Sequence, residues 1–577
     1  MSGLSYRLFF QFLSLWICTA VWAASPAPVS APNGMVVSSQ ADATRAGVAM
    51  LRAGGNAVDA AVATAFAVGV TQPFSTGIGG GAFILIRTAE GEVVAVDARE
   101  TAPAAASRDM YVREGVDERA SVHGPLAVAT PGLVAGLAMV LERYGTMSLY
   151  EVMQPAIALA ETGFEIGSYN ARLMGFMRAR LPADRFAETH RIQFPPEGEP
   201  IREGWRLVQK DLAGTLTKIA EGGPKAFYEG EIARAIADEM DRRGGLLNAV
   251  DLASYRPVVR EPVRGTYRGL VVHSFPPPSS GGVLLVQMLN ILEGYSDLGA
   301  RGPGSSASLH VITEAMKLAF ADRAFFLGDP DFVEIPMETL VSKDYAAAQR
   351  GRIDPPWFRR APWNWFRGEM AITVEAPGIP VEDHGTTHLS VTDAHGNAVA
   401  ITKTINTPYG SGITARGTGV ILNNEMDDFA KAIGVPNSYG LIDTRGANLV
   451  APKKRPLSSM TPTILEKDGR VWMVTGSPGG SRIISSTLLS VLNVVDYGMN
   501  VKQAVSAPRF HHQWEPDKLF VEPATPADVV EALRARGHEV EVSRRNWSAV
   551  EAIWVDPETR RHYGGNDPRR DGLALGY

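Results

Sequence analysis

Cysteine is almost absent from this sequence. The 577 residues contain one, Cys18, and it lies in an N-terminal segment that we expect to be removed. The mature chain would then have no thiol, which excludes a disulfide framework, a cysteine nucleophile and a thiolate metal site. An excess of basic charge is also lacking. With a net charge of −6 and 20% charged residues, composition gives no support for binding to nucleic acid or another polyanion.

Hydrophobic runs long enough to cross a membrane are missing after the N-terminus. There, Arg7 precedes an apolar run from Leu8 to about Trp22, which ends in small residues at Ala23 and Ala24. This pattern predicts a signal peptide over residues 1–24, cleaved near its end, and therefore a periplasmic or secreted protein. An uncleaved membrane anchor is the alternative, although a run of about 15 residues is short for a span.

Helical and strand patterns alternate irregularly along the chain, whose length suits two to four domains or one large enzyme fold. The run 57–70 is apolar on all sides but contains Asp59, which favours a buried helix. A hairpin is expected from strands at 82–87 and 92–97, with Arg99 just beyond it. Residues 120–350 are mostly helical in pattern, and 483–497 are helical again. Strand patterns occupy 387–393, 397–405, 418–423, 461–467 and 470–475. We therefore expect sheets covered by helical layers.

Two short stretches do not fit a known motif or a regular secondary structure. The sequence GIGGG at 77–81 lacks the spacing of a dinucleotide-binding loop. Residues 355–368 are rich in tryptophan and proline and show no clean period, so we expect an irregular, exposed segment there.

A hairpin over residues 386–404 would bring two threonines together. The turn sequence DAHGN at 393–397 sets a register in which Thr386 faces Thr404 and His388 faces Thr402. Because side chains alternate along a strand, these four share one face, which Asn406 continues. A cross-strand threonine pair is most simply a sheet stabiliser.

Gly385 gives the threonine pair a second interpretation. A threonine hydroxyl is a good nucleophile when its residue begins a chain, because its own α-amine, with a pKa near 8, can accept the proton. Thr386 becomes a chain end only if the bond from Gly385 is cut, and a glycine carbonyl is unhindered for attack by the Thr386 hydroxyl. Thr404 could orient that hydroxyl. Thr387 points to the opposite face and is expected to be structural.

The remaining polar clusters would suit an amino-acid ligand. Asn423, Asn424, Glu425, Asp427 and Asp428 follow a predicted strand; they lack the spacing of a calcium loop but could hold an ammonium group. A solvated turn is the simpler explanation for them.

Two further motifs could complete such a site. Ser458 and Ser459 supply hydroxyl donors, and Arg99 could bind a carboxylate. Gly479 and Gly480 precede a helical run, where their N–H groups would suit an oxyanion, although a plain strand-to-helix turn has the same pattern. We predict neither a metal nor a cofactor.

Motifs along nearly the whole mature chain resemble those of γ-glutamyltranspeptidases (glutathione hydrolases), which are N-terminal-nucleophile hydrolases. They are GGNAVDAAVA, GIGGGAF, DARETAP, ATPGLVAG, PPPSSGG, EAMKLAFADR, LGDPDF, GTTHLSV, NNEMDDF, RPLSSMTPT, GSPGGSRI and the terminal NDPRRDGLALGY. The resemblance implies an α+β fold, a four-layer αββα sandwich. It also implies a proenzyme that cuts itself between Gly385 and Thr386 into a large subunit (25–385) and a small subunit (386–577), which stay together as a heterodimer.

The resemblance also implies roles for single residues. Thr386 would be the nucleophile that forms a γ-glutamyl acyl-enzyme, with Thr404 as its hydroxyl partner and Gly479 and Gly480 as the oxyanion hole. The α-carboxylate of the substrate would lie on Arg99, Ser458 and Ser459, and its α-amine on Asn406, Glu425 and Asp428. Residues 433–443 would form a lid with Tyr439 at its gating position.

Glutathione and other γ-glutamyl compounds are the implied donors, with water, an amino acid or a dipeptide as the acceptor. Two alternatives stay open: a cephalosporin (glutaryl) acylase or polyglutamate-processing relative, and a non-catalytic exported glutamate-binding protein. The Trp-rich segment 355–368 departs from the family pattern close to the cut.

Overall fold

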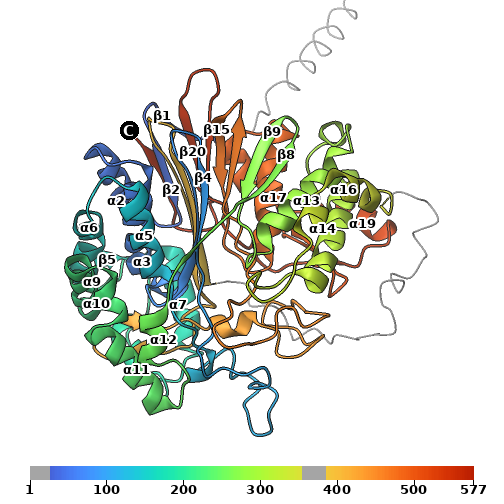
Figure 1. Ribbon diagram of the computed structural model, residues 1–577. Helices are drawn as coiled ribbons and strands as arrows, with labels where there is room; N and C mark the ends of the chain where they lie inside the picture. Colours follow the sequence, from blue (N-terminus) through green and yellow to red (C-terminus); the bar gives the residue numbers. More distant parts are fainter. Residues whose placement is uncertain (1–25, 354–384) are drawn as a thin grey trace, which may run out of the picture.

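The computed structural model describes residues 26–353 and 385–577. The predicted signal peptide and the Trp-rich segment 355–368 lie outside these ranges. The described chain forms two seven-stranded sheets whose neighbouring strands are all antiparallel. Figure 1 shows the sheets side by side, with helices on both outer sides. The predicted four-layer α+β sandwich is confirmed.

The first sheet holds the predicted nucleophile. In spatial order its strands are β21 (Leu573–Gly576), β2 (Met35–Ser38), β10 (Gly385–Thr392), β11 (Ala398–Asn406), β3 (Gly81–Arg87), β4 (Val93–Ala98) and β7 (Val258–Arg260). The second sheet consists of β1 (Val29–Ala31), β20 (His562–Gly565), β19 (Ala552–Val555), β15 (Arg470–Thr475), β14 (Thr463–Lys467), β9 (Leu270–Ser274) and β8 (Val263–Tyr267). Apolar side chains of both sheets, such as Phe83 and Ile464, pack between them.

Helices cover the outer face of each sheet. Those beside the first sheet are α2 (Ala41–Arg52), α3 (Ala57–Thr71), α5 (Leu133–Tyr144), α6 (Leu149–Thr162), α7 (Ser168–Arg178), α9 (Lys210–Gly222), α10 (Pro224–Tyr228) and α11 (Glu231–Arg243). Those beside the second sheet are α13 (Gly281–Glu293), α14 (Ser306–Phe326), α16 (Lys343–Arg350), α17 (Arg482–Val495), α18 (Val501–Ser506) and α19 (Ala527–Ala535).

Shorter elements complete the described chain. They are α4 (Pro73–Thr76), α8 (Ala187–Gln193), α12 (Ala249–Ser254), α15 (Met337–Leu340), β5 (Phe164–Glu165), β6 (Arg206–Leu207), β12 (Thr414–Ala415), β13 (Val420–Ile421), β16 (Phe510–His511), β17 (Leu519–Val521), β18 (Val540–Val542) and the 3-10 helices η1 (Pro125–Ala127), η2 (Gly299–Arg301) and η5 (Glu425–Asp428). None of the helices in residues 26–353 and 385–577 is long and apolar enough to span a membrane.

The predicted hairpin has the predicted register. Thr386 pairs with Thr404 and His388 with Thr402, and a bulge between residues 385 and 386 places Gly385 opposite Asn406. Thr387 points to the other face, where its hydroxyl lies 2.5 Å from that of Ser39.

The predicted strand at 418–423 is wrong in length. Only Val420–Ile421 is extended, and it pairs with Thr414–Ala415 outside the two large sheets. Gly417 and Gly419 have φ angles of 71° and 68°, so the backbone turns there instead of continuing as a strand.

Helix α3 is buried along its whole length, as its sequence predicts, and Asp59 anchors its start. The Asp59 carboxylate accepts hydrogen bonds from the backbone of Asn56, Thr146 and Met147 and from the Thr146 hydroxyl. The Asn56 side chain completes a capping box. A single acid thus joins two helices by satisfying three backbone donors.

Replacing this acid should cost stability without touching the pocket. Asp59→Ala leaves three N–H groups without their acceptor, so we expect the free energy of unfolding in urea to fall by about 3 kcal/mol. Asp42→Ala, which removes an exposed ion pair with Arg45 on α2, is the control and should cost under about 1 kcal/mol. Equal effects of the two changes would contradict the anchoring role.

Candidate active site

One pocket contains nearly all the residues that the sequence pointed to. It is lined by Arg99, Thr386, Thr404, Asn406, Glu425, Asp428, Tyr439, Leu441, Leu457, Ser458, Ser459, Met460, Gly480 and Ile483. Of the residues predicted for the site and the cut, Gly479 and Gly385 are not in its lining. The apolar members Leu441, Leu457, Met460 and Ile483 lie within the quoted motifs and the loop 433–443, but the sequence analysis had not singled them out.

The Thr404 hydroxyl links the predicted nucleophile to the peptide bond before it. Its oxygen lies 2.9 Å from the Thr386 hydroxyl, donates to the Gly385 carbonyl at 2.7 Å and accepts the Asn406 N–H at 2.8 Å. Since the single proton of Thr404 goes to that carbonyl, the Thr386 hydroxyl is the donor in the threonine pair. The bond to Gly385 also polarises the carbonyl that Thr386 would attack.

Gly385 has no room for a side chain. A Cβ atom there would lie 2.5 Å from both the carbonyl carbon and the oxygen of Thr407 and 2.8 Å from the Asn406 oxygen. These are backbone atoms of the strand end opposite, which cannot move aside without separating Thr386 from Thr404. Close backbone approach is therefore a second reason for glycine, beside the unhindered carbonyl expected from the sequence.

The acidic stretch after β13 divides into structural and pocket-facing residues. The Asn423 amide donates to the carbonyls of Gly79 and Ala129 and accepts the N–H of Glu425. Asp427 is turned to the hydroxyl of Ser121, at 2.6 Å.

The other two acids of this stretch, Glu425 and Asp428, belong to the 3-10 helix η5 and line the pocket. Only these two acids are thus available to a ligand's amine.

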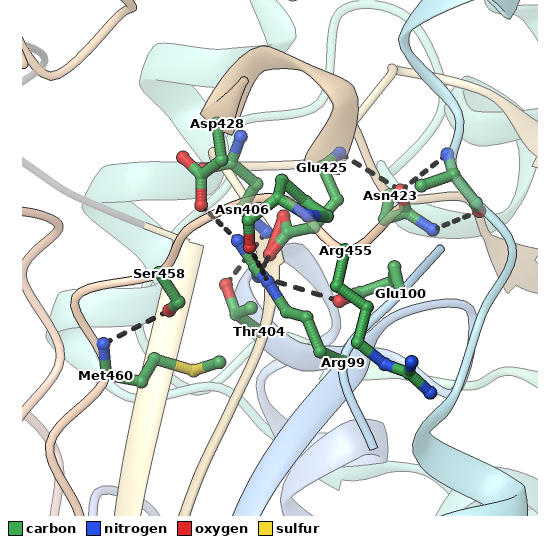
Figure 2. Close-up of polar contacts among 12 residues, drawn as sticks. Arg99, Glu100, Thr404, Asn406, Asn423, Glu425, Asp428, Arg455, Ser458 and Met460 are labelled. Atoms are coloured by element: carbon green, nitrogen blue, oxygen red, sulfur yellow. Dashed lines mark hydrogen bonds and ion pairs between the residues drawn. The ribbon is translucent and has the colours of Figure 1, made fainter. Parts of the chain in front are cut away.

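Arg99 is the cation at the centre of this acidic site. Figure 2 shows its guanidinium between Glu425 and Asp428, with which it forms ion pairs, and Glu100 on its other side at 3.5 Å. Its Nε donates to the Pro456 carbonyl at 3.1 Å. The sequence had assigned Arg99 to a ligand's carboxylate and the acids to its amine, whereas here these groups bind each other.

Burial shifts the titration of this cluster. Desolvation raises the pKa of Glu425 and of Asp428 above their usual values, although Arg99 opposes both shifts. Desolvation would lower the pKa of Arg99, but Glu425 and Asp428 more than offset it, so its pKa is raised. Arg99 therefore stays charged while the acids around it hold their protons more strongly.

Ser458, Ser459 and Tyr439 close the pocket from other segments. The Ser458 hydroxyl accepts the N–H of Met460 at 3.1 Å (Figure 2). The Tyr439 hydroxyl donates to the side-chain oxygen of Asn406 at 2.5 Å, and its carbonyl accepts from Gln513 at 3.0 Å. Tyr439, in the loop 433–443, is thus held through both its hydroxyl and its backbone carbonyl.

The predicted glycine turn lies directly under Tyr439. Gly479 and Gly480 have φ angles of 135° and 57°, and a Cβ on Gly480 would lie 2.4 Å from the Tyr439 ring. In residues 26–353 and 385–577, neither glycine N–H has a hydrogen-bond acceptor. Of these two glycines, Gly480 lines the pocket.

Comparison with known proteins decides the family. The model of the family described as gamma-glutamyltranspeptidase matches residues 43–577. The chain belongs to the γ-glutamyltranspeptidase family. It is 48% identical to the glutathione hydrolase proenzyme of Escherichia coli, over 95% of this chain and 93% of that one, and 41% identical to the acylase ACY 1 proenzyme of Pseudomonas sp. (strain V22), over 92% and 91%.

Solved structures give the same result for the fold. The cephalosporin acylase from Bacillus halodurans is 31% identical, with a TM-score of 0.83 over 97% of this chain and 98% of that one. The γ-glutamyltranspeptidase of Helicobacter pylori is 40% identical, with a TM-score of 0.55 over 57% of this chain and 94% of that one. As a member of this family, the chain is a self-processing γ-glutamyl acyltransferase and hydrolase, which excludes the alternative of a non-catalytic binding protein.

Three residues near the pocket were missed by the sequence analysis. Glu100 follows Arg99 in the same motif, and Gln513 supports Tyr439. Arg570 donates to the Thr386 carbonyl at 2.8 Å. Adjacency could have signalled Glu100, but nothing in the sequence places Gln513 or Arg570 near residues so distant in the chain.

A possible metal-binding group lies outside the pocket. Ligand atoms of His310, Glu314 and His538 lie within 4.8 Å of one another. However, His310 Nδ1 and His538 Nε2 already share a hydrogen bond of 2.8 Å, and the Lys317 amine lies 3.2 Å from Glu314. The bound cation of Lys317 makes this arrangement complete without a metal.

Glu100 should make the stability of the protein depend on pH. It is fully buried, neither of its oxygens has a hydrogen-bond partner among the described residues, and desolvation raises its pKa to about 8. Because the folded-state pKa is raised, its contribution is fully present below about pH 4.5 and is lost as the pH rises through about 8. Glu100→Gln should flatten this decline, by at most about 1.4 kcal/mol per pH unit. Urea unfolding of the wild type and of Glu100→Gln at pH 5, 6.5 and 8 measures this decline in the free energy of unfolding. An equal decline in both proteins would contradict the attribution of the pH dependence to Glu100.

Proposed function

We propose that the chain cuts itself between Gly385 and Thr386 and that Thr386 is then the nucleophile for glutathione and other γ-glutamyl compounds. The observation that carries this proposal is the hydroxyl pair, in which Thr404 contacts both the Thr386 oxygen and the Gly385 carbonyl. The products would be a large subunit, 25–385 after export, and a small subunit of 192 residues (577 − 386 + 1).

Self-cleavage would proceed through an ester. The Thr386 oxygen attacks the Gly385 carbonyl carbon, the C–N bond breaks, and the amine of Thr386 takes the hydroxyl proton. Water then hydrolyses the ester, which leaves a carboxylate on Gly385 and restores the hydroxyl of Thr386. The hydrogen bond from Thr404 stabilises negative charge on the carbonyl oxygen during the attack.

The free α-amine then serves as the base in turnover. It accepts the Thr386 proton as the oxygen attacks the γ-carbonyl of the donor, and it passes that proton to the departing amine. Gly479 and Gly480 offer N–H groups for the oxyanion. Water completes hydrolysis of the acyl-enzyme, and an amino-acid or dipeptide amine completes transfer.

Substrate binding would exchange ion pairs around Arg99. The α-carboxylate of the donor binds the guanidinium of Arg99 and the hydroxyls of Ser458 and Ser459. The α-ammonium of the donor then replaces Arg99 as the partner of Glu425 and Asp428, next to Asn406. Each buried charge keeps a partner throughout, so the exchange avoids the cost of an isolated ion in the interior. Tyr439 covers the acyl-enzyme and limits access of water.

Glutaryl acylase activity is the second candidate, since the relatives include two acylases. A glutaryl amide has the same terminal carboxylate as a γ-glutamyl amide but lacks the α-amine. The acid pair Glu425 and Asp428 favours the donor that has an amine. We also propose export directed by residues 1–24, which mass spectrometry of the secreted or periplasmic protein would test.

Removing the nucleophile should stop cutting. Thr386→Ala is expected to stay one chain without activity, while the wild type gives two bands and a second N-terminus beginning TTHLS. Thr387→Val is the matched control. The hydroxyl of Thr387 points to Ser39 and away from the cut, so cutting should continue in this variant. Two bands from Thr386→Ala would refute the nucleophile assignment.

Weakening the proposed substrate-binding residues Arg99 and Asp428 should lower the affinity for substrate but should not affect self-cleavage. For Asp428→Asn and Arg99→Lys we expect complete cleavage but a KM for a γ-glutamyl anilide raised about 10- to 100-fold, the value of one or two charge-assisted hydrogen bonds. Asp427→Asn, an adjacent acid directed away from the pocket, should leave KM near wild type. Steady-state kinetics on γ-glutamyl and glutaryl anilides measure both, and a preference for the glutaryl compound would favour the acylase alternative.

A further inference from the structure

The strand that carries Thr386 lacks a neighbour on one side at its beginning. Strand β10 pairs with β11 from Gly385 onward, but its ladder with β2 covers only Leu389 to Thr392. Strand β2 ends at Ser38, where the chain turns into α2. On that side, no strand within residues 26–353 and 385–577 accepts or donates hydrogen bonds at the first residues of β10.

Arg570 fills this gap. Its Nη1 donates to the Thr386 carbonyl at 2.8 Å, and the residue is 8% exposed. Its guanidinium also lies over the Tyr169 ring, 5.1 Å from the centroid. The next residue, Asp571, accepts the N–H groups of Tyr169 and Asn170 at the start of α7, so the segment that carries Arg570 is itself fixed.

Cutting makes this contact more important. The pairing of Gly385 with Asn406 ties the strand only while the peptide bond is intact. After cleavage Thr386 is a chain end, and chain ends fray unless they are held. The Arg570 contact reaches the backbone of Thr386 itself and does not depend on Gly385.

We propose that Arg570 is a positioning residue for the nucleophile, which fixes the carbonyl of Thr386 so that its hydroxyl and its new α-amine keep their places. This inference rests on the proposed role of Thr386. A displacement of about 1 Å at a reacting group can cost about 100-fold in rate, so a contact to the backbone of the nucleophile residue bears directly on kcat.

The same guanidinium also acts electrostatically on the α-amine of Thr386. A cation within hydrogen-bond distance of the residue disfavours protonation of that amine, which must be neutral to act as the base. Other titratable groups also lie near Thr386. In the pocket these are Arg99, Glu425, Asp428 and Tyr439. On the same strand it is His388, and burial lowers the pKa of His388 to about 3. Glu551 interacts electrostatically with Arg570, and burial raises the pKa of this carboxyl well above its usual value.

The test compares Arg570→Gln and Arg570→Lys with Arg172→Gln. Arg172 also lies over the Tyr169 ring, at 5.5 Å, but is exposed and makes no bond to Thr386. For each variant we measure the extent of self-cleavage, kcat and KM for a γ-glutamyl anilide, and the pH dependence of kcat. Arg570→Gln should cut more slowly or lose about tenfold in kcat, with KM within about twofold, and the acidic limb of its kcat profile should move up by about one pH unit.

Arg570→Lys keeps the charge and one donor, so it should retain the wild-type acidic limb and recover part of kcat. If Arg570→Gln does not fold, Arg570→Lys alone tests the positioning role through its kcat and its pH profile. Arg172→Gln should match the wild type throughout. Wild-type cleavage, kcat and pH profile in Arg570→Gln, or in Arg570→Lys a shifted limb with no recovery, would overturn the inference. The proposed function would fail separately, through an active Thr386→Ala.

Discussion

The close approach of two backbones at Gly385 is the constraint on which the rest of the site depends. Strand β11 ends against the Cα of Gly385, with the Thr407 carbonyl in the space that a side chain would need. This contact brings the Thr404 hydroxyl to the Gly385 carbonyl and to the Thr386 hydroxyl together. Under the proposed mechanism, one arrangement would serve first the cut and afterwards the nucleophile that the cut produces.

The second constraint is the balance of charge in a buried pocket. Arg99 faces three carboxyl groups, Glu425, Asp428 and Glu100, in an interior where an unpaired ion is costly. A ligand that enters must supply both a carboxylate and an ammonium, or leave one of these charges without a partner. This balance is the reason that we propose the α-amino-acid end of a γ-glutamyl compound as the ligand of the pocket.

Local sequence signals predicted the parts of the site that depend on local geometry. The turn at Asp393–Asn397 fixed the register that pairs Thr386 with Thr404, and alternation then placed Thr387 on the far face. The polar clusters containing Arg99, Glu425 and Ser458 were singled out by their residue types, whereas their separate roles and the four-layer sandwich followed from the family resemblance.

Contacts between distant segments could not be read in the same way. The ion pairs of Arg99 with Glu425 and Asp428, and the reach of Arg570 to Thr386, join residues separated by more than 180 positions. They depend on how strands from separate parts of the chain lie side by side. The short β13 was over-predicted because two glycines with positive φ turn a β-rich sequence aside.

The sheet order explains why such distant segments meet at the nucleophile. Strands β2 and β21 complete the sheet beyond β10, yet β2 stops short of Thr386. A fully paired strand would bury the Thr386 carbonyl in a ladder, whereas an early end leaves it open to a side chain from the segment before β21. At Thr386 the chain thus has a contact from a charged side chain where a longer β2 would have supplied a backbone contact.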